Sequence, residues 1–187
     1  MTAQRLTAIP LRAEAFAPYG DVIEARGAPS RMINQGQCAR HHDLAQLDFA
    51  DGRAGLSLFD AQARHLPHAV AMVERHPEGS QAFIPLDGVR LLVVVTDDDD
   101  GRPVGPRAFV TAPEQAVNLH RGVWHGVLTP LGAPGRCVVI DRIGDGPNLV
   151  EHWFNTPYIV EDIAEEAGDL APGASRRARM GMDHRFR

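Results

Sequence analysis

The sequence predicts an all-β protein, built as a sandwich or a barrel. Between residues 54 and 142, short runs rich in β-branched and aromatic residues follow one another, with Gly, Pro and Asp between them. No long amphipathic helical pattern interrupts these runs, which argues against a parallel sheet of βαβ units. The predicted strands cover residues 55–59, 69–76, 80–85, 89–96, 107–111, 116–119, 123–129 and 136–142.

The segment before these strands is predicted from its turn-forming residues. Residues 12–17 favour one or two helical turns, ended by Pro18 and Gly20. Residues 21–24 then favour a short strand. The stretch 25–37 is rich in Gly, Pro, Ser and Asn, which indicates a loop.

Three later segments need their own interpretation. The acidic run 97–100 lies between a strand and Gly101, which favours a solvated hairpin loop over a metal site. Residues 157–167 favour a helix with a proline near its start. We expect one catalytic domain over residues 1–165, with a few short peripheral helices, and a flexible C-terminal tail over residues 166–187.

Composition narrows the functional classes. The chain has 187 residues and a formal net charge of −5, which argues against nucleic-acid binding because that function favours a basic face. The two cysteines, Cys38 and Cys137, form no C-x-x-C pair that would suggest a zinc framework. We see neither a signal peptide nor an apolar run as long as a membrane span, and we expect a cytoplasmic enzyme.

The segment 72–88 carries the first candidate site. Alternate side chains of a strand share a face, so Glu74 and His76 are predicted to lie side by side. Gln81 and Phe83 can share a face on the next strand, across the turn at 77–79. A carboxylate, an imidazole and an amide would then meet on one inner surface. Burying such groups is costly unless they are bonded or ligate a metal.

The segment 117–127 carries the second candidate site. Val123, His125 and Val127 share one strand face, so His125 would project among apolar neighbours. His120 lies on the turn that leads into this strand.

These two segments resemble the paired motifs of the cupin superfamily. The first cupin motif has the form H-x-H, then a Glu and a later Gly; here Glu74 replaces the first His, His76 matches the second, and Gln81 replaces the Glu. In the second motif, P-x-G-x-x-H, His120 replaces the Pro and His125 matches the His. The resemblance implies a double-stranded β-helix, or jelly-roll barrel. Glu74, His76 and His125 alone could still form a facial metal site with two nitrogens and one oxygen.

A closer resemblance is to the ureidoglycolate lyase family, over residues 5–163. Its most specific parts are ERHPEGSQAFIP and NLHRGVWH, and further parts follow in the family's order: AFAPYGDVI, INQG, RHHDLA, RAFVT and IDR. The resemblance implies cleavage of (S)-ureidoglycolate to glyoxylate and urea, within the breakdown of allantoin and purines. It also implies a homodimer.

This chemistry requires a base for the substrate hydroxyl, an acid for the departing nitrogen and a cationic anchor for the carboxylate. We expect His76 and His125 to act as acid and base or as metal ligands, and Glu74 to be the alternative base or third ligand. The family resemblance suggests nickel or manganese as the ion. Arg142 or Arg40 is the candidate for holding the substrate carboxylate, and Gln81 and Asn118 are candidates for binding the urea amide. His120 is the candidate for orienting the leaving group.

Two other functions stay open at this point. One is another cupin enzyme, such as a sugar isomerase or a dioxygenase, although a dioxygenase would normally keep an intact histidine-rich ligand set. The other is a non-catalytic cupin that binds a small carboxylate and regulates a partner. Hydrolysis of ureidoglycolate to ammonia and carbon dioxide would give the same glyoxylate, so the nitrogen product separates it from the lyase.

Overall fold

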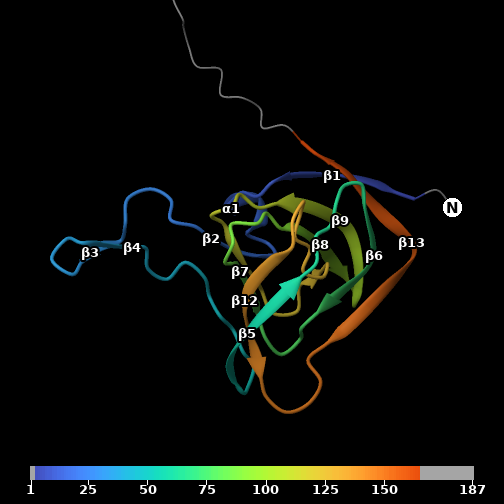
Figure 1. Cartoon of the computed structure of the whole chain (residues 1–187). Helices are drawn as coiled ribbons and strands as arrows, with labels where there is room; N and C mark the ends of the chain where they lie inside the picture. Colours follow the sequence, from blue (N-terminus) through green and yellow to red (C-terminus); the bar gives the residue numbers. More distant parts are fainter. Residues whose placement is uncertain (1–2, 165–187) are drawn as a thin grey trace, which may run out of the picture.

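The computed structural model describes residues 3–164 and is built almost entirely from strands (Figure 1). Six strands close into a barrel, because β1 pairs in parallel with both β13 and β9. In barrel order these strands are β1 (Arg5–Pro10), β13 (Val150–Ile163), β6 (His68–Arg75), β11 (Trp124–His125), β8 (Leu92–Asp99) and β9 (Arg102–Val110).

A second sheet of five strands packs against this barrel. Its order is β2 (Gly20–Ile23), β10 (Ala116–Leu119), β7 (Gln81–Pro85), β12 (Gly135–Ile143) and β5 (Arg53–Ala61). All four pairings within it are antiparallel. The all-β class and the barrel that the sequence predicts are therefore confirmed.

Two hydrophobic clusters account for this arrangement. One draws only on barrel strands and the loops beside them, with Val73, Val94 and Trp124 among its members, and it fills the barrel. The other combines barrel residues such as Val95 with Phe83 and Val139 of the five-stranded sheet, so it lies between the two sheets. Successive residues of β8 alternate between the clusters, as the period of two in a strand requires.

The short helix α1 (Ala13–Phe16) agrees with the prediction for residues 12–17, and it is the single helix among residues 3–164. The predicted helix over 157–167 is wrong in its described part, because β13 continues through Ile163. Tyr158, Ile159 and Val160 pair with β6 there, and Val160 is buried in the barrel core. Pro157 lies within a register shift of that pairing, where a missing N–H is tolerated.

The acidic run 97–100 forms a hairpin, but its turn is shorter than predicted. Strand β8 extends to Asp99, and only Asp100 and Gly101 take the positive φ angles of a tight turn. Asp98 is also not simply solvated, because it accepts hydrogen bonds from Trp124 and Arg75.

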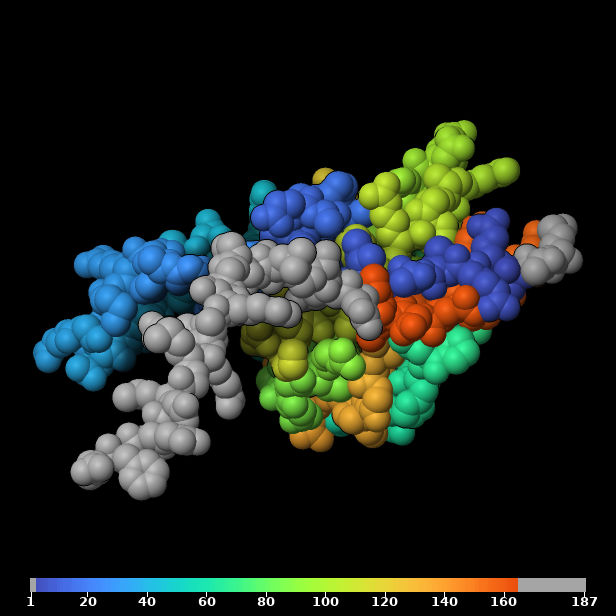
Figure 2. All heavy atoms as spheres, turned by 90° about the horizontal axis from the view of Figure 1, so that it is seen from above, coloured from blue at the N-terminus to red at the C-terminus, as the bar shows by residue number. Residues whose placement is uncertain are grey.

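The predicted loop at 25–37 contains part of a small hairpin, β3 (Arg31–Ile33) paired with β4 (Cys38–Arg40). This hairpin stands away from the two sheets, as Figures 1 and 2 both show. The predicted tail at 166–187 lies outside the described residues. Within residues 3–164, no helix is long and apolar enough to cross a membrane.

Candidate functional site

Three predicted site residues meet at one end of the strands. Glu74 lies near the end of β6, His76 directly follows that strand, and His125 closes β11. The two strands are antiparallel neighbours, with His125 opposite Glu74 in the register. His125 also lies opposite Val95, a member of the core between the sheets. All three side chains therefore point from the barrel wall toward the five-stranded sheet.

The distances show that the three side chains form one group. Glu74 Oε1 lies 3.8 Å from His76 Nε2 and 3.8 Å from His125 Nε2. The two imidazole rings are 5.3 Å apart between centroids. One ligand atom from each of the three residues lies within 4.8 Å of the other two. His125 is almost completely buried, whereas Glu74 and His76 are partly exposed.

Backbone carbonyls set the protonation of both histidines. His76 Nδ1 lies 2.7 Å from the Asn148 carbonyl oxygen, and His125 Nδ1 lies 2.9 Å from that of Val123. A carbonyl oxygen can only accept, so each Nδ1 must donate its N–H. In a neutral imidazole, each Nε2 then presents a lone pair. Both Nε2 atoms are buried and have no hydrogen-bond partner among the described residues.

Burial also decides what these groups can do at neutral pH. Burial lowers the pKa of His125 to about 4, against the opposing effect of the Val123 carbonyl. His125 is therefore neutral near pH 7 and has no spare proton to donate as an acid. Burial raises the pKa of Glu74, an effect that His76 opposes and Glu151 reinforces. Glu74 is thus a stronger base than an exposed carboxylate.

This set of atoms fits a divalent metal ion. Metal-binding histidines are typically held by a hydrogen bond from the other ring nitrogen, and both histidines have that bond here. Two imidazole nitrogens and one carboxylate oxygen form a donor set that suits several transition metals. The unpartnered Nε2 atoms would gain ligand bonds that the protein itself does not give them.

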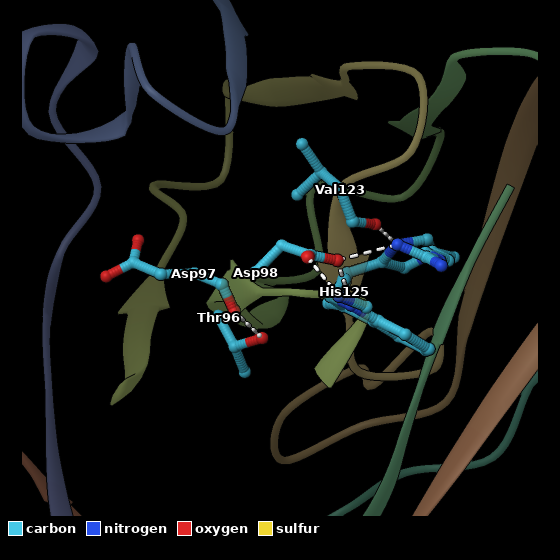
Figure 3. A network of polar contacts seen from close by, with 8 residues as sticks. Thr96, Asp97, Asp98, Val123 and His125 are labelled. Carbon is cyan, nitrogen blue, oxygen red and sulfur yellow. Dashed lines mark hydrogen bonds and ion pairs between the residues drawn. The ribbon is translucent and has the colours of Figure 1, made fainter. Parts of the chain in front are cut away.

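A polar network on the barrel side fixes the same two strands. Arg75 lies between Glu74 and His76, and Trp124 directly precedes His125. Trp124 Nε1 donates to Asp98 Oδ2 at 2.8 Å, and an Arg75 N–H donates to the same oxygen at 2.6 Å. The Arg75 guanidinium also lies 4.5 Å from the Trp124 ring centroid. Figure 3 shows Asp98 of this network and, separately, the contact of His125 with the Val123 carbonyl.

Gln81 points into the core between the sheets from the five-stranded side. It shares its strand face with Phe83 and lies opposite Leu119, and both are members of the core between the sheets. Its Oε1 is buried without a partner among the described residues. Asp141 on β12 has a buried, unpartnered Oδ1 as well. Sequence reasoning missed Asp141, although its alternation with Cys137 and Val139 could have shown that it points inward.

His120 and Asn118 form a different group, on the outer face of the five-stranded sheet. Asn118 lies opposite Ala82, so its side chain points away from the side that carries Gln81. It donates to Asp21 at 2.9 Å, and His120 Nε2 lies 3.3 Å from the same carboxylate. Burial alone would raise the pKa of Asp21, but hydrogen bonds from Asn118, Gln46 and His120 together keep it low.

The two predicted arginines do not join the cluster. Arg142 is buried on the strand face opposite to Asp141, and its guanidinium donates to Asp51 and to the Asp145 carbonyl. Arg40 is exposed on the projecting hairpin, where its guanidinium lies 2.9 Å from His42 Nδ1.

The family model and the most similar relatives point to one family. Residues 3–161 match the family model described as ureidoglycolate lyase. A ureidoglycolate lyase of Rhodobacter capsulatus is 64% identical over 84% of this chain and 99% of its own length. Ureidoglycolate lyase 2 of Rhizobium meliloti is 51% identical over 81% of this chain and 94% of its own length. Among solved structures, RmlC from Streptococcus suis in complex with dTDP-D-xylose aligns with a TM-score of 0.35 and 14% identity, over 73% of this chain and 56% of that one.

The low pKa of His125 predicts how stability depends on pH in metal-free protein. The unfolded chain protonates this histidine near pH 6.5, but the folded chain does so only near pH 4. The stabilisation from neutral His125 is therefore complete above pH 6.5 and is lost as the pH falls toward 4. We therefore compare the unfolding free energies of wild type and His125→Gln. As the pH falls from 6.5 to 4, wild type should lose roughly a few kcal/mol relative to the variant.

Urea unfolding of both proteins in chelator, at several pH values, measures this difference. Comparing the two proteins cancels the opposite contribution of Glu74. A difference that is flat between pH 7 and pH 4 would contradict the assignment. Nitrogen-detected NMR of the histidines gives an independent check, since His125 should carry its proton on Nδ1.

Proposed function

The chain belongs to the ureidoglycolate lyase family, and from this we propose that it cleaves (S)-ureidoglycolate to glyoxylate and urea. We place this reaction in allantoin and purine breakdown. The observation that supports the chemistry best is the cluster of Glu74, His76 and His125, in which two buried Nε2 atoms lack protein partners.

The reaction is an elimination, so no water is consumed. The substrate carbon carries a hydroxyl, a carboxylate and a ureido nitrogen. Loss of the hydroxyl proton lets that oxygen form the aldehyde carbonyl of glyoxylate while the bond from carbon to nitrogen breaks. The departing nitrogen takes up one proton and leaves as urea. One proton is thus removed and one is returned, and a single group can do both.

We assign this proton transfer to Glu74. In the metal-free cluster, burial raises its pKa, which makes it a stronger base for the hydroxyl than an exposed carboxylate. The same carboxyl group, once protonated, can return the proton to the leaving nitrogen. Oε1 faces both histidines at 3.8 Å, so the second oxygen of the carboxylate is available for the proton. His125 is neutral at pH 7 and is not the acid.

We propose that His76 and His125, through Nε2, and Glu74, through Oε1, hold a divalent ion such as nickel or manganese. When bound, the ion would polarise the substrate hydroxyl and offset the charge of its carboxylate. The Asn148 and Val123 carbonyls keep the two imidazoles in the tautomer that this requires. Arg142, with Asp51 as its partner, is not needed for this anchor.

We further propose that the protein is a cytoplasmic homodimer. The two cysteines form no disulfide, as is usual in a reducing compartment. The outer face of β5, β12 and β7 carries apolar side chains, with Leu56 71% and Leu58 59% exposed. A second copy would cover such a face. Its members are Leu56, Leu58, Ile84, Leu86, Val138 and Ile140.

The lyase proposal predicts equal amounts of urea and glyoxylate, without ammonia, from purified protein and fresh (S)-ureidoglycolate. Chelator should abolish the activity, and added divalent metal should restore it. Glu74→Gln should lower kcat by roughly a hundredfold or more, because proton transfer by a positioned group contributes about that much. Glu114→Gln is the matched control, since this exposed carboxylate precedes β10, at the end of that strand away from Gln81.

Two results would contradict this proposal. Ammonia in place of urea would make the protein a hydrolase. No product above the spontaneous background, with metal supplied, would move the assignment to another cupin activity or to ligand binding.

The dimer proposal predicts that sedimentation velocity gives twice the chain mass for wild type. Leu58→Glu should shift the protein toward monomer, because it would bury a charge on each side of the interface. The control is Leu44→Glu, because Leu44 is equally apolar but less exposed and lies outside this sheet. This variant should leave the dimer intact. Wild type that sediments as a monomer, or a Leu58→Glu variant that stays dimeric, would sink this proposal.

A further inference from the structure

The side of the site facing the histidines carries a second pair of unpartnered atoms. Gln81 Oε1 and Asp141 Oδ1 are both buried, and neither has a hydrogen-bond partner among residues 3–164. Gln81 itself is only 6% exposed. A buried acceptor without a donor costs free energy, so such atoms are rare in native proteins unless a ligand or water completes them.

Strand register places these two oxygens beside each other. Cys137, Val138, Val139 and Ile140 of β12 pair in sequence with Pro85, Ile84, Phe83 and Ala82 of β7. Continued by one residue, the same register sets Asp141 opposite Gln81. Opposite residues of an antiparallel pair share a face and lie about 5 Å apart at their Cβ atoms.

The pair lies at the same end of the fold as the metal-binding cluster. Only a short turn separates the end of β6, beside His76, from the start of β7 at Gln81. The Asn148 carbonyl, in the loop that follows β12, bonds His76. Asp141 is nevertheless not one of the three residues whose ligand atoms lie within 4.8 Å of one another. It therefore lies beyond the cluster and is available to a different part of a bound molecule.

The chemistry of the pair identifies that part. An ionised carboxylate only accepts hydrogen bonds, and the amide oxygen of Gln81 accepts as well. Two adjacent acceptors would repel the carboxylate end of ureidoglycolate. They suit its ureido end, where an N–H and an NH₂ on the two nitrogens present donors in one plane.

We propose that Gln81 and Asp141 form the subsite that accepts hydrogen bonds from the ureido nitrogens, holding the urea leaving group opposite Glu74. This inference rests on the proposed function, which supplies the ureido substrate. It replaces Asn118 by Asp141 as the partner of Gln81, because Asn118 points to the outer face and donates to Asp21. Asp141 is then a specificity-determining residue.

Binding of N-methylurea tests the subsite separately from catalysis. The probe carries the same N–H and NH₂ donors, and saturation-transfer NMR can follow its methyl signal with metal-loaded protein. We expect binding to wild type and a loss of roughly ten- to a hundredfold in affinity for Asp141→Leu and Gln81→Met, which remove the acceptors at similar volume. Asp141→Asn, which keeps an acceptor oxygen, should lose less. The matched control is Asp87→Asn, because Asp87 is an exposed carboxylate just beyond the other end of β7.

Glyoxylate binding, measured on the same samples, separates a subsite from general damage. The proposal requires that Asp141→Leu keeps its affinity for glyoxylate and for the metal while it loses N-methylurea. Equal loss of all three ligands, or unchanged binding of N-methylurea, would overturn it. If N-methylurea binding depends on Asp141 but wild type releases no urea from ureidoglycolate, the subsite stands and the proposed function falls. If wild type releases urea while the variants bind N-methylurea normally, the proposed function stands and the subsite falls.

Discussion

The site depends on one pairing, in which β11 lies between β6 and β8 with His125 opposite Glu74. This register sends Glu74, His76 and His125 toward the five-stranded sheet and sends Arg75 and Trp124 to the opposite, barrel side. A slip by one residue would exchange the two faces, since side chains alternate along a strand. The bonds of Trp124 and Arg75 to Asp98 hold the register from that barrel side.

The second constraint is burial of polar atoms that the protein does not satisfy alone. Two Nε2 atoms and two acceptor oxygens are directed into the end of the core between the sheets. Apolar packing around Val95, Phe83 and Val139 must offset the cost of keeping them there. In the proposed function this cost has a counterpart, because the nitrogens suit a metal ion, the oxygens suit a ureido group, and binding of both would satisfy these atoms.

Sequence periodicity was enough to predict the all-β class and to place Glu74 and His76 on one face, because a period of two assigns faces directly. The meeting of these two residues with His125 followed from the resemblance to the paired cupin motifs. Periodicity could not show which way Arg142 points, because only the pairing of β12 with β7 shows that its neighbour Asp141 is the inward residue. The strand at 157–163 escaped prediction because β13 is formed by pairing with distant β6. The tautomers also depend on distant contacts, as with Asn148, 72 residues from His76.

A crystal structure of the protein grown with manganese and examined by anomalous scattering tests the proposed metal site most directly. We expect one anomalous peak bonded to His76 Nε2, His125 Nε2 and a Glu74 oxygen, with the Asn148 and Val123 carbonyls still accepting hydrogen bonds from the Nδ1 atoms. A peak at other residues, or no peak while these three side chains bond directly to one another, would contradict it.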